Sequence, residues 1–214
     1  MKGSKASRED VHQIAAQYIA NSDPVFGRLI TRVGPCRLSE EIRPITTTFE
    51  ALLEAITHQQ LSTKAAATIY ARVCAVAPTL EPEVFSQLDA STLRAAGLSR
   101  AKVLAVHDLA ERASTGEVPS MEALRNMDDA HIIENLSHIR GIGRWSAEML
   151  LIFRLGRLDV LPIQDLGIQQ GFSASFRKTK EPIARAIAQR GARWQPYRSV
   201  ASWYLWRLAE MSRL

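Results

Sequence analysis

Short helix-forming segments follow one another along nearly the whole chain, and residues that begin or end helices separate them. Ser22 or Asp23, followed by Pro24, predicts the start of a helix that stops at Gly34. Ser99 is expected to cap a helix that runs to about residue 113. The other expected helices cover about residues 8–21, 49–59, 63–77, 82–88, 90–96 and 129–137, with Ser7, Thr48, Ser62 and Asp128 as caps.

The segments between these helices leave little room for β-structure. Residues 34–47 contain two prolines and the start of a threonine run, and are expected to be a loop. Residues 160–163 are the one strand-like stretch, and Pro162 weakens that interpretation because proline donates no hydrogen bond to a sheet. The predicted fold class is therefore all-α, with ten or eleven short helices and no linker between independent domains.

Composition places the chain among globular proteins. Its 214 residues suffice for one core or two small lobes. With 46% hydrophobic and 23% charged residues, the composition argues against disorder. No apolar run reaches the roughly 18 residues that a transmembrane helix needs, and the polar N-terminus shows no secretory signal. No membrane partner is expected.

Positive charge and tryptophan gather in the last third of the chain. Residues 140–214 carry 13 Lys and Arg against five Asp and Glu, while residues 1–139 carry 14 against 17. All four tryptophans lie in the basic segment, and 21 of the 27 basic residues are arginines, whose planar guanidinium suits phosphate. This pattern suggests a nucleic-acid partner, although an Arg-rich solvated surface would have the same composition.

The two cysteines, Cys36 and Cys74, limit the metal and redox chemistry of the chain. Two thiols cannot form a four-cysteine zinc site or hold an iron–sulfur cluster. A single disulfide is one alternative, and two unpaired buried thiols in a cytosolic protein are favoured. The five histidines show no metal-ligand spacing and are interpreted as structural.

A glycine-containing turn between two helical segments carries the clearest functional signal. The helix that ends near Ser137 is followed by Gly141 and Gly143 on either side of Ile142, and Arg144 opens the next helix. Glycines let the backbone approach a ligand closely, and the amides of a helix N-terminus favour an anion. Ile142 is expected to anchor the turn in the core. The turn is predicted to grip one phosphate group of a DNA strand.

A proline and an aspartate downstream of this turn, Pro162 and Asp165, complete a recognisable pattern. The hairpin, the proline and the aspartate together resemble the helix-hairpin-helix, Gly/Pro-Asp superfamily of DNA base-excision glycosylases. Within it, the chain is most similar to the 3-methyladenine DNA glycosylase II group. Four blocks carry that similarity: ITHQQLSTKAA from Ile56, GLSRAKVL from Gly97, QDLGI from Gln164 with Gly171 and Phe172, and WQPYRSVA from Trp194.

The resemblance implies a two-lobed helical fold with the active site in the cleft between the lobes. One lobe would cover residues 48–135, and the other would combine residues 1–47 with 136–214. The whole chain would form a single glycosylase unit of the compact form, which lacks an N-terminal β-domain. It would act as a monomer on double-stranded DNA containing alkylated bases. The protein would be cytoplasmic and nucleoid-associated in a bacterium or nuclear in a eukaryote, with no required cofactor and no iron–sulfur cluster.

The resemblance places catalysis on Asp165. A fixed carboxylate stabilises the positive charge that develops on the sugar when an N-glycosidic bond breaks. By its position alone Asp165 would cap the following helix, and it can do both. Relatives that also cut the backbone have a lysine two residues past the second hairpin glycine, where this chain has Trp145, which cannot form a Schiff base. A monofunctional hydrolase of N-glycosyl bonds without AP lyase activity is therefore implied, and nearby Asp159 is interpreted as a turn residue.

A pocket for a flipped base is also implied. Trp145 and Trp206 match pocket positions of the group, and Met149 and Phe153 follow Trp145 at four-residue steps on one helix face. Methylated purines such as 3-methyladenine and 7-methylguanine are cationic, so electron-rich rings attract them. Ordinary core packing would use the same residues. Larger relatives have a tyrosine where this chain has Met149, which leaves selectivity among lesions open.

Gln60 lies in the loop position of the family's DNA-intercalating residue and is expected to fill the gap left by the flipped nucleotide. Its neighbours Gln59 and Leu61 are alternatives for that role. Arg144 and Lys64 are expected to contact phosphates. Relatives hold a monovalent cation with hairpin carbonyls, which by position implies Na⁺ or K⁺ on the backbone oxygens of Ser137, Ile139 and Ile142.

The leading interpretation is a DNA-3-methyladenine glycosylase II that acts in base excision repair. A non-enzymatic helix-hairpin-helix DNA-binding protein would share the hairpin but would not need Asp165 or the aromatic residues. A glycosylase for a deaminated or ring-opened base is a third alternative. It is favoured less, because the aromatic pocket comes without an evident set of hydrogen-bonding groups.

Overall fold

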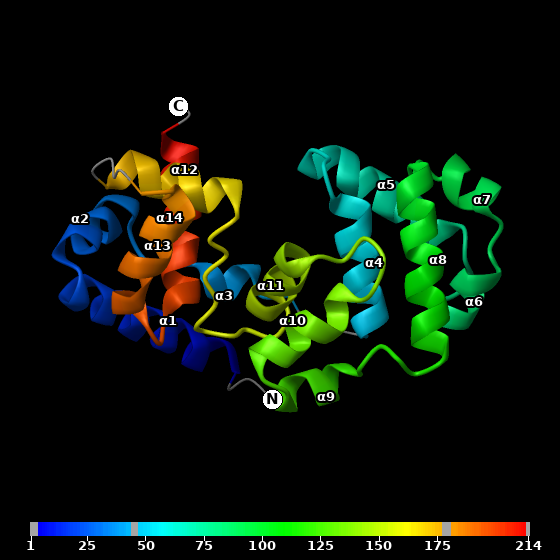
Figure 1. The fold of residues 1–214 in the computed structure, drawn as a ribbon, viewed down its shortest axis with the longest axis horizontal. Coiled ribbons are helices and arrows are strands. Elements are labelled where there is room, and N and C mark those ends of the chain that lie inside the picture. Colours follow the sequence, from blue (N-terminus) through cyan, green and yellow to red (C-terminus); the bar gives the residue numbers. More distant parts are fainter. Residues whose placement is uncertain (1–3, 44–46, 177–180, 213–214) are drawn as a thin grey trace. The chain divides into compact units, whose positions relative to one another are not determined.

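The computed structural model describes residues 4–43, 47–176 and 181–212. Within these ranges the chain forms 14 α-helices and one 3-10 helix (Figure 1). The all-α fold class is confirmed, and the expected number of ten or eleven helices was too low. The helices form two compact units. We call residues 1–43 with 151–214 the terminal unit, and residues 44–150 the central unit.

The central unit is built around a long helix, α8. The helices of this unit in the described residues are α4 (Thr48–His58), α5 (Thr63–Ala75), α6 (Pro82–Gln87), α7 (Ala90–Ala95), α8 (Arg100–Ser114), α9 (Met121–Asn126), α10 (Asp129–Ser137) and most of α11 (Arg144–Phe153). Helix α8 packs against α4, α6 and α7. Its apolar side chains Val103, Val106 and Ala110 are buried, as their helical spacing predicted, whereas Ala113 near its end is half-buried.

The terminal unit surrounds the last helix, α14. Its helices are α1 (Ser4–Ser22), α2 (Pro24–Val33), α3 (Leu38–Glu41), α12 (Leu166–Ser175), α13 (Ile183–Gly191), the 3-10 helix η1 (Ala192–Trp194) and α14 (Arg198–Met211). Helix α14 packs against α12, α2 and α1. Its approach to α12 is so close that a Cβ on Gly171 would lie 1.9 Å from the carbonyl oxygen of Leu205. Only glycine fits at residue 171.

Side-chain caps begin most of the predicted helices. Four expected caps are confirmed, each accepting the backbone N–H three residues further on: Asp23, Ser62, Ser99 and Asp128. At α4 the expected cap, Thr48, was wrong by one residue. The hydroxyl of Thr47 accepts from the Glu50 amide at 3.1 Å, while Thr48 instead donates to the Pro119 carbonyl.

Several other expectations need correction. Helix α1 begins at Ser4, ahead of the expected cap Ser7. The expected loop 34–47, of which residues 44–46 lie outside the described residues, contains the one-turn helix α3. Helices α9, α13 and α14 were not predicted. Residues 160–163 form no strand.

The border between the two units also differs from the predicted lobes. The prediction divided the chain between residues 135 and 136, whereas the compact units divide after residue 150. The physical reason is that the hairpin after α10 packs against α8, as described below, so it belongs with the central unit. The sequence could not show this, because the contact joins segments that lie more than 30 residues apart.

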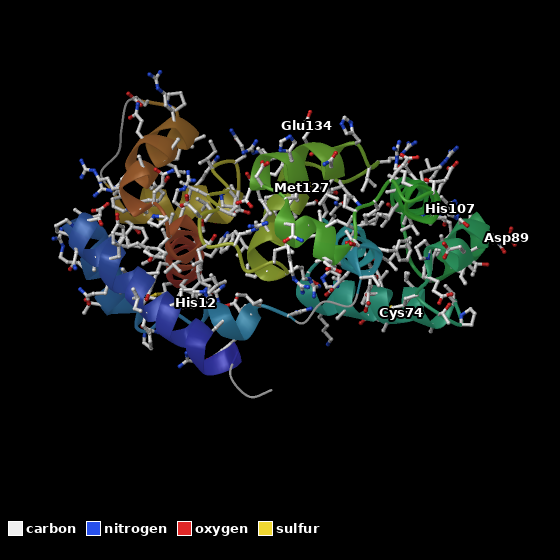
Figure 2. The ribbon with its side chains drawn as sticks, turned by 90° about the horizontal axis from the view of Figure 1, so that it is seen from below. His12, Cys74, Asp89, His107, Met127 and Glu134 are labelled. Carbon is white, nitrogen blue, oxygen red and sulfur yellow. The ribbon has the colours of Figure 1, made fainter. Side chains whose placement is uncertain are left out.

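Both cysteines are free thiols, as predicted. Cys36 is buried, and burial raises the pKa of its thiol to about 12. Cys74, labelled on α5 in Figure 2, is only half-buried. Among the described helices, none is long and apolar enough to cross a membrane.

Candidate active site

The hairpin lies where the sequence predicted it, between α10, which ends at Ser137, and α11. Ile139 and Ile142 are both buried and anchor the turn, as expected for Ile142. Gly141 has a φ of +78°, a conformation that favours glycine, and a Cβ there would lie 2.9 Å from the Cβ of Ala105 on α8. Backbone conformation and lack of space therefore both require glycine at this position.

Charged groups flank the hairpin. The amide of Arg140 donates to the carboxylate of Asp108 on α8 at 2.7 Å. The guanidinium of Arg144 donates through Nε to Glu148, which is buried, while the Arg144 side chain itself is 68% exposed. Lys64, on α5, is exposed. Arg144 and Lys64 are thus accessible cations of the central unit, and Arg144 retains further donors beyond its bond to Glu148.

The hairpin carbonyls offer neutral oxygen ligands. The carbonyl of Ile139 accepts the amide of Ile142 at 3.0 Å, and a carbonyl oxygen has a second lone pair, so this bond does not exclude a cation. Ser137 is the last residue of α10, where carbonyls lack partners within the helix. Neutral carbonyl oxygens suit a monovalent cation. In the part of the chain that the structure describes, no group of three or more His, Cys, Asp or Glu could hold a metal ion.

The turn between α4 and α5 carries the three residues considered for DNA intercalation. Gln60 is exposed and has a φ of +57°, the one positive φ of a non-glycine residue in the described ranges. Leu61 is also exposed, at 39%. Gln59 is half-buried, and its side-chain amide donates to the carbonyl of Gly141 at 2.8 Å. Gln59 is thus engaged within the protein, whereas Gln60 and Leu61 face solvent.

Asp165 is the N-cap of α12, as its position suggested. Its Oδ1 accepts two hydrogen bonds of 2.8 Å, from the amide of Ile168 and from the indole Nε1 of Trp206. Gly167 makes the second bond sterically feasible, because a Cβ there would lie 2.7 Å from Cδ1 of Trp206 and 3.1 Å from Oδ1 of Asp165. Two donors from different helices therefore hold this carboxylate in one orientation.

The loop that leads to Asp165 is fastened to the start of α14. The guanidinium of Arg198 donates to both carboxylate oxygens of Asp159, at 2.7 and 2.9 Å. The hydroxyl of Ser199 accepts from the amide of Val160 at 2.9 Å. Asp159 is engaged in this loop contact, in keeping with its interpretation as a turn residue. The position of Asp165 depends on α14 through both its loop and its hydrogen bond.

Aromatic rings gather beside this carboxylate within the terminal unit. The rings of Phe153 and Trp206 stack with their centroids 5.6 Å apart and their planes at 29°. Trp145 and Met149 lie earlier on α11, in the part that belongs to the central unit; Trp145 is 46% exposed and Met149 is half-buried. The structure thus brings together Asp165, Trp206 and Phe153 within one unit.

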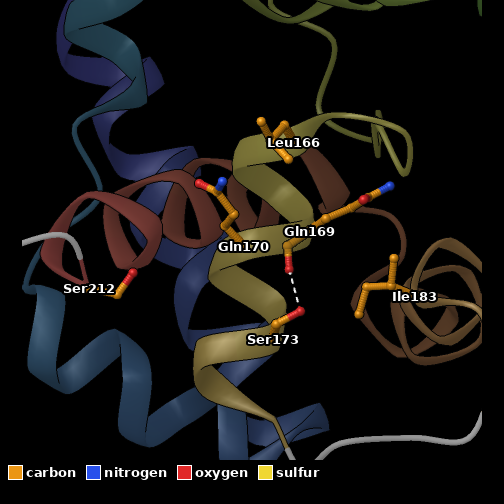
Figure 3. Close-up of a pocket in the computed structure, with 6 residues that line it drawn as sticks. All are labelled: Leu166, Gln169, Gln170, Ser173, Ile183 and Ser212. Atoms are coloured by element: carbon orange, nitrogen blue, oxygen red, sulfur yellow. Dashed lines mark hydrogen bonds between the residues drawn. The ribbon is translucent and has the colours of Figure 1, made fainter.

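A hollow of about 460 Å³ lies elsewhere on the terminal unit, against α12 (Figure 3). It is lined by Leu166, Gln169, Gln170, Ser173, Ile183 and Ser212. Neither Asp165 nor Trp206 lines it. This hollow is therefore separate from the carboxylate and the stacked rings described above.

The structural roles of three residues, Gly167, Gln59 and Lys102, were not predicted from the sequence. Gly167 makes room for the indole beside Asp165, and a glycine in the first turn of a helix was the available signal. Gln59 binds the hairpin through its side chain, and Lys102 binds the turn that presents Gln60. Lys102 lies in the block GLSRAKVL that begins at Gly97. That block resembles the family, but no function was predicted for Lys102.

Helix α10, the glycine turn and helix α11 form a helix-hairpin-helix motif, which defines a class of DNA-binding proteins. Residues 53–196 match the family described as HhH-GPD superfamily base excision DNA repair protein, and the chain belongs to this family.

Relatives from fission yeast support this assignment over nearly the full chain. The chain is 34% identical over 203 residues to DNA-3-methyladenine glycosylase 1 of Schizosaccharomyces pombe, covering 91% of this chain and 86% of that protein. It is 30% identical over 213 residues to the alkylbase DNA glycosidase-like protein mag2 of the same yeast, covering 97% and 98%. A structure of an S. pombe 3-methyladenine DNA glycosylase in complex with abasic DNA aligns with a TM-score of 0.78 and 33% identity, covering 94% and 97%.

Proposed function

We propose that this protein is a DNA-3-methyladenine glycosylase that excises alkylated purines from double-stranded DNA in base excision repair. The observation that carries the proposal is the carboxylate of Asp165, oriented by the indole of Trp206, whose ring stacks on Phe153. A fixed anion beside an aromatic surface suits a reaction in which both the departing base and the sugar carry positive charge. The similarity to the yeast 3-methyladenine glycosylase supports the same activity.

The carboxylate of Asp165 serves as the catalytic group. When the N-glycosidic bond breaks, positive charge develops on the sugar, and a fixed carboxylate stabilises that charge without reorganising. The same carboxylate can orient the attacking water. Because two donors hold its Oδ1, the group does not need to be ordered during the reaction, which is the source of its catalytic advantage.

Within the terminal unit, Trp206 and Phe153 form the aromatic surface for the flipped base. Trp206 and Phe153 present one stacked surface, and Trp145 and Met149 share the α11 face with Phe153. Cationic bases such as 3-methyladenine and 7-methylguanine are attracted to these electron-rich rings. The weak glycosidic bond of such bases reduces the need for specific hydrogen bonds.

The reaction ends with base release. Trp145 occupies the position from which a lysine attacks the sugar in relatives that also cleave the backbone, and an indole cannot form a Schiff base. The enzyme is therefore monofunctional, with water as the nucleophile. It requires no cofactor and no iron–sulfur cluster.

The central unit grips the DNA. The amides of Gly141 and Gly143 face one phosphate, while Ile142, expected to bind the backbone as well, bonds its amide to the Ile139 carbonyl and anchors the turn. Arg144 and Lys64 contact phosphates nearby. Gln60 enters the duplex to fill the space of the flipped nucleotide.

The hairpin carbonyls of Ser137, Ile139 and Ile142 would hold Na⁺ or K⁺, which would add positive charge where a phosphate binds. The two units work as a single glycosylase, a monomer acting on DNA. The enzyme is cytoplasmic and nucleoid-associated in a bacterium, or nuclear in a eukaryote.

The test is release of free bases from methylated duplex DNA by the wild-type protein and by Asp165→Asn. Asparagine keeps a side-chain oxygen that can cap α12, so the fold should persist. Loss of the charge should slow release by about 10²–10³ or more. The matched control is Asp89→Asn, which makes the same change at the exposed N-cap of α7, labelled in Figure 2, and should release bases normally.

Three outcomes separate the alternatives. Near-normal release by Asp165→Asn would remove this residue from the mechanism. DNA binding without release of any base by the wild-type protein would favour a non-enzymatic DNA-binding role. Release of deaminated or ring-opened bases in preference to methylated purines would assign a different lesion class.

A further inference from the structure

The turn that presents Gln60 has an unfavourable backbone conformation. Gln59 has φ −52° and ψ 133°, and Gln60 has φ +57°. Both angles of Gln59 and the φ of Gln60 match a type II turn, in which the second central residue is normally glycine because its φ is positive. A long side chain at this position costs conformational free energy, and such strain persists only where the surrounding structure holds it.

Lys102 supplies part of that hold. Its Nζ donates to two backbone carbonyls, those of Thr57 and Gln59, both at 2.8 Å. These carbonyls lie at the C-terminal end of α4, where helix carbonyls lack partners and where the helix dipole favours a positive charge. The ammonium thus binds both the end of α4 and the residue directly before Gln60. Burial lowers the pKa of Lys102, in keeping with an ammonium drawn partly out of water.

The same turn is joined to the hairpin. The side-chain Nε2 of Gln59 donates to the carbonyl of Gly141 at 2.8 Å, and it lies 3.4 Å from the hydroxyl of Ser146 at the start of α11. Gln59 therefore binds Lys102 through its backbone carbonyl and the hairpin through its side chain. Movement of the hairpin would pull directly on the turn.

Helix α8 is the common support of both elements. Lys102 binds the turn, Ala105 leaves no room for a Cβ on Gly141, and the carboxylate of Asp108 accepts the amide of Arg140 at 2.7 Å. These three residues recur every three positions, so they share one face of α8. One helix face thus contacts the turn before Gln60 and the start of the glycine turn, at Arg140 and Gly141.

We propose that Lys102 and Gln59 are positioning residues that hold Gln60 ready for insertion and fasten its turn to the phosphate-binding hairpin. This inference rests on the proposed role of Gln60 in the glycosylase function. It gives a function to the sequence block around Lys102, which has no role in the chemical step of base release. Binding of a phosphate by the hairpin would then place Gln60 at a defined distance from the strand.

The first experiment measures affinity, so that it does not depend on base release. The probes are an undamaged duplex and a duplex with a stable abasic-site analogue. The proteins are wild type, Lys102→Met, Gln59→Met, Gln60→Ala and the double variant Lys102→Met with Gln60→Ala. The control is Arg72→Met, which removes one positive charge from an exposed position on α5 of the same unit. Thermal unfolding verifies that each variant is folded.

The wild-type protein should prefer the abasic duplex, because its gap accepts Gln60. Lys102→Met should reduce that preference by about tenfold or more, because it removes both hydrogen bonds that the charged ammonium donates to the end of α4 and to Gln59. Gln59→Met should also reduce the preference for the abasic duplex, and it keeps the backbone bond to Lys102. It therefore provides the test if Lys102→Met is too unstable to measure. The double variant should be no worse than Gln60→Ala alone, because Lys102 acts through Gln60. Arg72→Met should keep the wild-type preference.

The second experiment measures single-turnover release of 3-methyladenine from paired and mispaired duplexes. Lys102→Met should slow release from the paired duplex more than from the mispaired one, since less pairing must then be broken. A purely structural role would slow both equally and would add to the effect of Gln60→Ala; either result overturns the inference. Failure of the wild-type protein to release any base refutes the proposed function instead, while the binding experiment still decides the inference.

Discussion

Replacing Trp206 with phenylalanine isolates the hydrogen bond that orients the candidate catalytic carboxylate. The smaller ring can still stack on Phe153, so an aromatic surface for the base remains. The change removes the indole N–H, which donates to Oδ1 of Asp165 at 2.8 Å. The amide of Ile168 continues to bind the same oxygen, so α12 keeps its cap. The variant therefore tests orientation of the carboxylate rather than its presence.

The size of the effect follows from the kind of bond that is lost. A hydrogen bond to a charged group contributes about 1.5–3 kcal/mol. If that amount is lost from the transition state, release slows by between about tenfold and about 150-fold. The slowing should be similar for every lesion, because the bond touches the carboxylate and not the base. Trp206→Leu, which removes the aromatic surface, should in contrast change the ranking of lesions.

The assay is single-turnover release of 3-methyladenine and 7-methylguanine from duplex DNA. The matched control is Trp203→Phe, one turn earlier on α14. The indole of Trp203 donates to the carboxylate of Glu41 at 2.7 Å, so this variant loses an equivalent bond away from Asp165. It should unfold at a lower temperature and release bases at the wild-type rate. Gly167→Ala should reproduce the defect of Trp206→Phe, because its Cβ would displace the indole.

The reasoning fails if Trp206→Phe releases both bases within about threefold of the wild-type rate, well below the loss expected for a bond to a charged group. It also fails if the two lesions are affected very differently. The first result would show that the hydrogen bond does not contribute to catalysis, and the second would assign Trp206 to base recognition alone.

Three further expectations concern stability and reaction type. Asp23→Ala should lower the free energy of unfolding at pH 7 by about 3 kcal/mol in chemical denaturation, because it leaves Arg190 without its buried partner. Burial raises the pKa of Asp23, but the hydrogen bonds from Arg190 and Trp194 outweigh this effect, so the pKa in the folded protein lies below 3.8. The stability difference between the wild type and Asp23→Ala should therefore disappear only as the pH falls below that value. A constant stability difference down to pH 2 would contradict this. Gly171→Ala should lower the melting temperature sharply, by a loss of about 3 kcal/mol, because its Cβ would meet the Leu205 carbonyl; an unchanged melting temperature would show that α12 can shift freely. Borohydride should trap no covalent complex with methylated or abasic DNA, since Trp145 stands where a lysine would be needed, and an abundant adduct would overturn the monofunctional assignment.

Local chemistry was sufficient to predict the all-α class and most of the helices, but not α14, the helix at the centre of the terminal unit. Asp23, Ser62, Ser99 and Asp128 accept the amides that the start of a helix leaves without partners, and this requirement involves only three neighbouring residues. The glycine turn before α11 was predictable for the same reason. The four-residue helix α3 escaped prediction because it contains too little of a period. Helices α9, α13 and α14 were missed as well.

The resemblance of four sequence blocks led to the family and to Asp165, but the arrangement around that residue needed coordinates. Asp165 and Trp206 are 41 residues apart, and their hydrogen bond exists only because α12 and α14 pack closely enough for Gly171 to touch the backbone of Leu205. No local pattern encodes that approach.

The link between the turn of Gln60 and the hairpin was likewise beyond the reach of sequence patterns. Gln59 and Gly141 are 82 residues apart, and Lys102 joins the turn from a third segment. Capping and turn formation depend on bonds within a few residues, so they can be read from neighbouring side chains. The contacts that orient Asp165 and hold Gln60 depend on how helices distant in sequence pack together, and tertiary packing alone decides them.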